Sequence, residues 1–203
     1  VEGLLAGLEA SYVLDTEAFK RAKDKIISDF SSEKVRPCSH CGLTYPADPS
    51  ELRDRLDGIL AGEAPVSEPA GKLRALVCPH IDLSVGHRVY ASAYQMLKHT
   101  NFSRVVVLGV GHTLANDLFC LTDKDFQTPL GVIEAERSLV RELREDGGDI
   151  LATNDFAHRA EHSIEFQLIF LQHLFKGVSF TLIPILCGFL QSCLPEYTRK
   201  AYL

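Results

Sequence analysis

Residues 73–113, LRALVCPHIDLSVGHRVYASAYQMLKHTNFSRVVVLGVGHT, decide the fold that the sequence predicts. The apolar runs 73–79 and 104–110 at its two ends are typical of buried strands, and the residues between them have helical spacing. A strand, a helix and a second strand of this length predict parallel strands with a right-handed connection. His80 and His112 follow the two strands, so we expect both imidazoles at the sheet edge where α/β proteins bind ligands.

The rest of the chain predicts further elements of the same kind. We therefore expect an α/β domain over residues 36–203, with a central, mostly parallel sheet flanked by helices. A helix should begin at Asp48-Pro49, because an acidic N-cap, a proline at the first helical position and a glutamate at the third agree. The other expected elements are helices over 89–99, 134–145 and 161–175, strands over 117–122 and 178–186, a linker over 64–71, a loop over 126–131 and a short helical tail after Gly188.

Residues 1–35 predict a separate helical extension. Asp15 or Thr16 is suited to cap a helix whose apolar residues recur at intervals of three and four. Because the chain begins at Val1 without a methionine, we expect this helix to connect to a preceding segment. No chemistry is visible in this part of the chain.

Composition indicates an ordinary globular protein, with 46% hydrophobic and 24% charged residues among 203. A net charge of −6 and the absence of a Lys/Arg stripe argue against a nucleic-acid partner. No apolar run approaches the roughly 20 residues that span a bilayer, so no membrane association is expected. We expect a cytoplasmic location.

The six cysteines leave several interpretations open. Cys38 and Cys41 frame a C-x-x-C pair beside His40, which suits zinc or redox chemistry, but no second ligand pair follows at matched spacing. Two loop thiols are the simpler expectation. Cys78, at the end of an apolar run, is either a thiol nucleophile or a structural thiol, and its setting favours the structural role. No G-x-S-x-G elbow or phosphate-binding loop is present.

The densest polar cluster is His158-Arg-Ala-Glu161-His162-Ser163-Ile164-Glu165. If a helix starts early enough, His158, His162 and Glu165 share one face, at a spacing that suits ligands. The alternative is a helix N-terminus, where Glu161 complements the helix dipole. Because an apolar stripe follows directly, the cluster should lie at the rim of the core, which favours a site role for Glu161 and His162.

Six blocks, taken in chain order, resemble the Memo protein family. Glu161-His-Ser-Ile-Glu165 is the most diagnostic. The others are Tyr45-Pro-Ala-Asp-Pro49, Pro79-His80 with Gly86, Leu108-Gly-Val-Gly-His112, Phe126-x-Thr-Pro-Leu-Gly131 and Ile183-Pro-Ile-Leu-Cys-Gly188.

The resemblance implies a fold similar to the class III extradiol ring-cleaving dioxygenases, which hold non-haem iron on histidines and a carboxylate. It implies a pocket to which His80 and His112 contribute as metal ligands. The family has no settled enzymatic activity. Its animal member is associated with receptor-driven cell motility and with copper and redox chemistry, and microbial members have a functional link to radical-SAM-like and AMMECR-type proteins.

The sequence departs from the family pattern at three places. Ile81-Asp82 stands where the family has Ala-Gly, which puts an acid near the pocket. His112-Thr113 stands where the family has two histidines. A later Ser-Ser-Asp-Phe block with further pocket residues is missing, so the domain is expected to lack its C-terminal part and the metal site to be incomplete.

Our prediction is a Memo-like protein with a metal-binding pocket for iron, copper or zinc and metal-dependent redox or dioxygenase-like chemistry. His80 and His112 are the predicted metal ligands, His162 and Glu161 the catalytic residues, and Asp82 and Glu165 the substrate contacts. The alternative is a scaffold that binds a peptide or a small molecule in the same pocket without turnover. A third possibility is a zinc-bound thiol module at Cys38 and Cys41.

Overall fold

The computed structural model describes residues 2–62, 71, 73–98, 100–114 and 117–189. The chain divides into two compact units, Val1–Glu33 and Lys34–Leu203. The first contains helices α1 (Glu2–Ala10) and α2 (Glu17–Ser32). Of the two caps predicted for α2, Thr16 is the one used, and its hydroxyl accepts a hydrogen bond from the Phe19 amide at 3.4 Å. None of the described helices is long and apolar enough to cross a bilayer.

The second unit is built on two small mixed sheets rather than one central, mostly parallel sheet. One sheet has the order β1-β4-β5, with β1 (Val35–Arg36) parallel and β5 (Gly131–Ile133) antiparallel to β4 (Asp125–Thr128). The other has the order β2-β6-β3. Its strand β6 (Thr181–Cys187) runs parallel to β2 (Arg104–Val110) and antiparallel to β3 (Phe119–Leu121). The protein is α/β, as predicted, but the predicted single, mostly parallel sheet is not observed among the described residues.

The predicted strand over residues 73–79 is wrong. These residues have no regular structure, and the side chain of Val77 is 94% exposed. The parallel neighbour of β2 is β6, which follows it much later in the chain, and residues 73–79 pair with neither strand. Helix α4 (Leu83–Gln95) begins six residues before the predicted Val89, because Asp82 caps it. An apolar run alone does not distinguish a buried strand from an irregular segment.

Two further predictions need correction. The predicted loop at 126–131 is the tight hairpin between β4 and β5, in which Gly131 takes a φ of 129°. Helix α6 (Glu165–Leu174) starts four residues later than predicted, and residues Phe156–His158 form a separate 3-10 turn. The Glu161 carboxylate accepts the amide hydrogens of the next two residues, and this local bonding competes with helix formation. His158, His162 and Glu165 therefore do not share a helix face.

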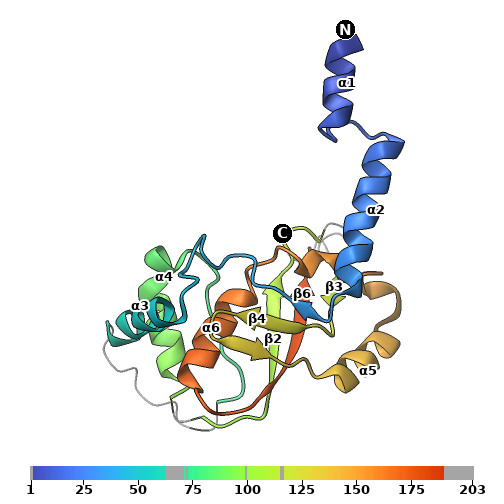
Figure 1. Cartoon of the computed structure of the whole chain (residues 1–203). Helices are drawn as coiled ribbons and strands as arrows, with labels where there is room; N and C mark the ends of the chain where they lie inside the picture. Colours follow the sequence, from blue (N-terminus) through green and yellow to red (C-terminus); the bar gives the residue numbers. More distant parts are fainter. Residues whose placement is uncertain (1, 63–70, 72, 99, 115–116, 190–203) are drawn as a thin grey trace, which may run out of the picture. The chain divides into compact units, whose positions relative to one another are not determined.

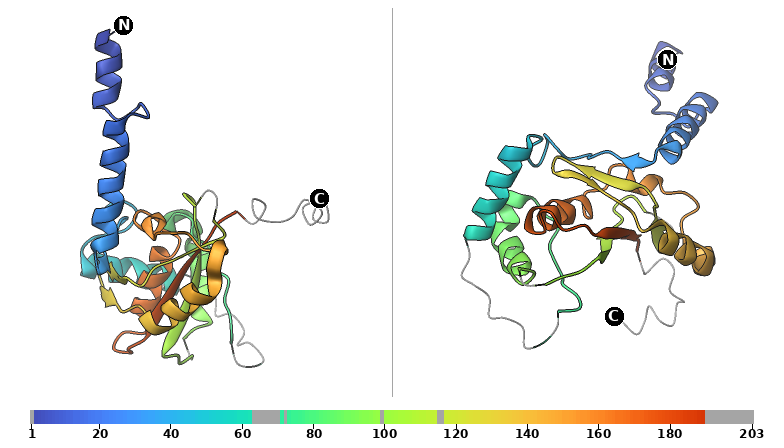
Figure 2. Two further views of the ribbon diagram at one scale, coloured as in Figure 1. Left: turned by 90° about the vertical axis from the view of Figure 1, so that its right-hand side faces the viewer. Right: turned by 60° about the horizontal axis from the view of Figure 1, so that its bottom comes forward.

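Three helices pack together on one side of the second unit. Helix α3 (Pro49–Ala61) is capped by Asp48 as predicted, ends at Gly62, and contacts both α4 and α6. The rings of Tyr90 and Tyr94 on α4 stack on Phe170 of α6, with centroids 4.9 and 4.5 Å apart. Figure 1 and the right view of Figure 2 show α6 between the α3–α4 pair and the strands.

The other side of the unit is covered by α5 (Arg137–Gly147), which packs on β6 through Val140. Strand β6 is therefore buried on both faces: Leu182 belongs to the main core and Ile183 to the cluster under α5. The predicted linker over 64–71, apart from Gly71, and the predicted tail after residue 189 lie outside the described residues.

Candidate metal centre

Three separate segments of the chain bring His80, His112 and His162 together. His80 comes from the irregular segment before α4, His112 follows β2, and His162 precedes α6. One ring nitrogen from each lies within 4.8 Å of the other two. The Nε2 atoms of His80 and His112 are 3.4 Å apart, and the rings of His112 and His162 stack with centroids at 4.9 Å. His80 and His162 are half-buried and His112 is exposed, so the group lies open to solvent.

Close backbone packing places His112 beside His162. At Gly109, an added Cβ would lie 2.6 and 2.7 Å from side-chain atoms of Ile164 and Ser163, so only glycine allows β2 to approach this segment. The Ser163 hydroxyl donates to the Val110 carbonyl at 3.0 Å. These contacts bring the end of β2 and the residues before α6 to the same point.

Gln167 on α6 positions the segment that carries His80. Its Nε2 donates to the Pro79 carbonyl at 2.9 Å, directly before His80. Its Oε1 accepts the Tyr94 hydroxyl at 2.7 Å, which ties the same residue to α4. The irregular segment that replaces the predicted strand is therefore held to the core by a side chain of α6.

Glu161 orients His112. Its side chain is 3% exposed and accepts from the His112 amide and from His112 Nδ1, each at 3.0 Å. Burial raises the pKa of Glu161, but the amides of Ser163 and His112 and the His112 ring outweigh it, so the pKa is lowered and the group is a carboxylate. An Nδ1–H donated to this carboxylate leaves the Nε2 lone pair of His112 facing His80.

The pKa values of the other two imidazoles are lowered, which favours their neutral form. Partial burial lowers the pKa of His80, and the neighbouring His112 adds to this effect, while Glu161 opposes it. Burial also lowers the pKa of His162, with Glu161 opposing and the surrounding imidazoles assisting. Neutral imidazole is the form that binds metal ions.

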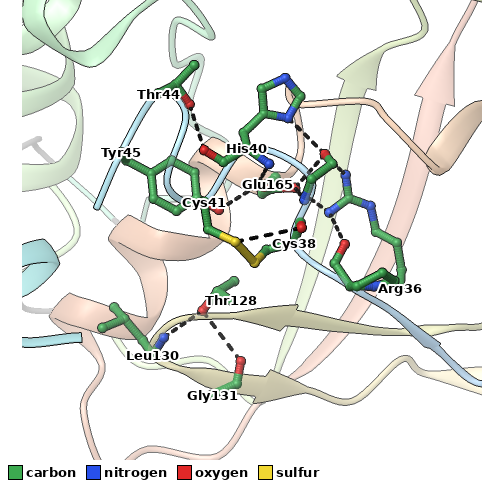
Figure 3. Close-up of a disulfide and its surroundings, with 12 residues drawn as sticks. Arg36, Cys38, His40, Cys41, Thr44, Tyr45, Thr128, Leu130, Gly131 and Glu165 are labelled. Atoms are coloured by element: carbon green, nitrogen blue, oxygen red, sulfur yellow. Dashed lines mark hydrogen bonds and ion pairs between the residues drawn. A yellow bond between two sulfur atoms is a disulfide. The ribbon is translucent and has the colours of Figure 1, made fainter. Parts of the chain in front are cut away.

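Glu165 lies four residues beyond Glu161 in the chain, in a different setting. It is fully buried, and its carboxylate accepts from the Arg36 guanidinium, the Tyr45 hydroxyl, the Ser39 hydroxyl and amide, and the His40 amide. Figure 3 shows the carboxylate between the 38–41 loop and Arg36. Burial raises the pKa of Glu165, but Arg36 and the hydrogen bonds outweigh it and lower the pKa. Glu165 is an anchor of this loop, and its predicted contact with a substrate stays a prediction.

Other predicted residues have structural partners. The Asp82 carboxylate caps α4 by accepting the Ser84 amide at 2.7 Å, and its predicted contact with a substrate stays a prediction. His158 is buried and is not part of the group of three histidines. Its Nε2 is 3.0 Å from the Cys120 carbonyl, and burial lowers its pKa to about 4. Cys78 is half-buried, and burial raises the pKa of its thiol, which suits the structural role.

Cys38 and Cys41 form a disulfide, which corrects the expectation of two loop thiols. With both sulfurs in one bond there is no thiolate pair to hold zinc, so the structure does not support the zinc-thiol module. The other described cysteines, Cys78, Cys120 and Cys187, are free.

Sequence reasoning missed two residues around the site. Arg36 is fully buried, and it donates to the carbonyls of His158 and Glu161 at 2.8 and 2.6 Å as well as to Glu165. His40, considered only as part of the C-x-x-C pair, lies with its ring centroid 5.2 Å from that of His162. Nothing in the sequence around Arg36 indicates that its side chain is buried. The possibility that His40 lies near the other histidines could have been considered.

The arrangement suits a transition metal. Two nitrogens that bind one ion at 2.0–2.1 Å in a tetrahedral site lie roughly 3.4 Å apart, which is the Nε2 separation of His80 and His112. Imidazole ligands suit iron, copper and zinc, and three protein ligands leave a position open. The fold and this cluster define an α/β protein in which His80, His112 and His162 could hold a metal ion.

The chain belongs to the Memo-like protein family, since the model of this family matches residues 36–198. It is 34% identical over 186 residues to a MEMO1 family protein of Aquifex aeolicus, covering 90% of this chain and 47% of the relative. It is 31% identical over 172 residues to the protein memo-1 homolog of Caenorhabditis elegans, covering 84% of this chain and 47% of the relative. The chain thus spans about half the length of these relatives. The predicted resemblance is confirmed.

Proposed function

We propose that the protein binds one transition-metal ion on His80, His112 and His162 and uses it in redox chemistry on a small molecule. The cluster of three imidazole nitrogens within 4.8 Å of one another is the observation that carries this proposal. The proposal gives His162 the role of a ligand, beside the two ligands that the sequence predicts, and the catalytic role predicted for it stays a prediction. Iron, copper and zinc all suit such a donor set.

Glu161 would act through His112 rather than on the ion. Its hydrogen bond to Nδ1 fixes the ring and increases its basicity, as carboxylates do for many metal-bound histidines. The ion would supply Lewis acidity or oxygen activation at its open position. Since the His112 side chain is 44% exposed, a small substrate has access to this side of the cluster.

The similarity of the family's fold to the extradiol dioxygenases supports oxidation of a small aromatic or redox-active compound as the reaction class. Fold likeness is a weaker argument than the site itself, so metal binding comes first and turnover second. A scaffold that holds the ion and a ligand without turnover is the competing function.

Metal titration tests the proposal. Calorimetry and elemental analysis of the purified protein with Fe²⁺, Cu²⁺ or Zn²⁺ should give one ion per chain. His80→Ala, His112→Ala and His162→Ala should each weaken binding at least 100-fold. The matched control is His87→Ala, since this histidine is exposed, is not part of the cluster, and has its Nδ1 2.9 Å from the Ser84 carbonyl. Equal binding by all four variants would overturn the metal site.

Oxygen consumption by the loaded protein with catechol-type compounds then separates the two functions. Turnover that disappears in His112→Ala supports the oxidase or dioxygenase function. Stoichiometric metal binding with no turnover supports the scaffold.

A further inference from the structure

The Cys38–Cys41 disulfide flanks His40, whose ring centroid is 5.2 Å from that of His162, and it has no part in the proposed metal site. We propose that it is a reversible dithiol–disulfide site which exchanges with an external thiol reductant, and that its redox state is sensed by His162 through His40. This inference does not depend on a bound metal.

Accessibility favours exchange at this bond. Both cysteines are half-buried, so their sulfurs are not enclosed in the core. By contrast, Cys120 is buried, and burial raises the pKa of its thiol to about 12. Exchange requires a thiolate to reach a disulfide sulfur, and in the described part of the chain only the Cys38–Cys41 pair offers a disulfide.

The exchange balances as a two-electron reduction. A thiolate of the reductant attacks the sulfur of one cysteine, which breaks the Cys38–Cys41 bond and forms a mixed disulfide. A second thiolate attacks the reductant sulfur of that mixed disulfide and releases the first cysteine. The protein gains two electrons and two protons as a dithiol, and the reductant leaves as its disulfide.

A structural role explains the bond poorly. It links residues three apart in one loop, and short closed loops gain the least stability from a cross-link. The loop is already held by other contacts. Glu165 accepts from the amides of Ser39 and His40, the His40 carbonyl accepts from the Leu43 and Thr44 amides, and Gly42 donates to the Tyr45 carbonyl. These bonds keep the two sulfurs close when the disulfide opens, which allows it to form again.

His40 connects this pair to the histidine cluster. It lies between the two cysteines, its amide donates to Glu165, and its ring centroid is 5.2 Å from that of His162. Opening the disulfide removes a constraint on both flanking residues of the Ser39–His40 dipeptide. A shift of His40 therefore changes the surroundings of the His162 ring.

Peptide mapping of the intact protein tests the exchange. Native protein is incubated with reduced glutathione or with thioredoxin and its reductase, free thiols are alkylated, and the tryptic peptide spanning residues 35–53 is analysed by mass spectrometry. We expect both cysteines to become alkylated, and the disulfide to return when glutathione disulfide is added. Reduction by glutathione alone assigns a small thiol as the partner, and reduction by thioredoxin alone assigns a dithiol protein. A disulfide that resists both reductants, or does not re-form, overturns the proposal.

Single variants identify the exchange intermediate. When incubated with glutathione disulfide, Cys41→Ser and Cys38→Ser should each form a mixed disulfide with one glutathione on the remaining thiolate, releasing one reduced glutathione. This adduct should persist, because the second protein thiol that would displace the glutathione is missing. The matched control is Cys187→Ser, which removes a free, half-buried thiol of β6 and should leave the exchange unchanged.

Imidazole NMR tests the link to His162. In metal-free protein with labelled histidines, reduction should shift the ring signals of His40 and His162. The ring of His173, which pairs with Asp57 at 2.8 Å, should not move. Exchange without any shift at His162 would overturn the coupling.

Discussion

Glu161 and Glu165 are carboxylates four residues apart in the chain, and their surroundings in the structure differ. Glu165 is paired with Arg36 and hydrogen-bonded to four further donors in the interior. Glu161 accepts from backbone amides and from the ring of His112, beside imidazoles that solvent reaches. A buried charge needs a full set of partners, whereas a site must leave lone pairs available. Glu165 therefore anchors the 38–41 loop, and in the proposed metal site Glu161 would orient His112 as a ligand.

Replacing the buried carboxylate should have the largest effect on stability. Glu165→Gln keeps the shape but leaves the Arg36 guanidinium buried without its counter-charge, which should lower the free energy of unfolding by roughly 3–5 kcal/mol. Urea unfolding followed by circular dichroism measures this loss. Glu161→Gln is the matched comparison and should destabilise less. Equal losses in the two variants would contradict the assigned difference.

The buried His158 should make stability depend on pH. Its pKa is lowered to about 4 in the folded protein, so the unfolded chain binds more protons between pH 6.5 and 4. Stability is then lost as the pH falls through this window, by about 3 kcal/mol from this group at pH 4.

His158→Gln should unfold with a shallower pH dependence over that range, because the glutamine amide can still donate to the Cys120 carbonyl without titrating. Urea midpoints measured from pH 7 to pH 4 give the comparison. Parallel curves for the two proteins would show that His158 titrates normally.

In the proposed metal site, Glu161→Gln should weaken metal binding 10–100-fold, because His112 loses a charged hydrogen-bond partner. Calorimetric titration measures the affinity, with Asp125→Asn as the control, since that carboxylate pairs with Arg137 and not with a histidine of the cluster. An unchanged affinity would make Glu161 purely structural.

The smallest effect is expected at Asp82. Asp82→Ala removes the cap of α4 and should cost about 1 kcal/mol of stability. If capping is its only role, metal affinity and turnover stay at the wild-type level, and Asp82→Ser recovers the stability. A loss of substrate affinity in both variants would instead support the substrate contact that the sequence predicts.

The sequence predicted well what local patterns determine. The Asp48-Pro49 helix start and the strand at 104–110 were both confirmed, because a cap and a run of β-branched residues each act within a few residues. The prediction that this strand is buried was wrong, since the side chains of Val106 and Leu108 are 55% and 67% exposed. The meeting of His80 and His112 was expected for partly the wrong reason, since His80 follows an irregular segment rather than a strand.

What the sequence could not predict depends on distant pairs. Arg36 and Glu165 are 129 residues apart, and the parallel partner of β2 is β6. The Gln167 contact that places His80 joins positions 88 residues apart. No spacing rule connects such positions, whereas the family resemblance selected the right blocks without showing how they contact one another.

X-ray absorption spectroscopy of the metal-loaded protein tests the three-histidine site most directly. We predict three imidazole nitrogens at about 2.0–2.1 Å from a bound zinc ion, and one fewer imidazole in each of His80→Ala, His112→Ala and His162→Ala. His87→Ala should give the wild-type spectrum. Sulfur ligands, or a ligand set unchanged by the three cluster variants, would contradict the assignment of the metal to these histidines.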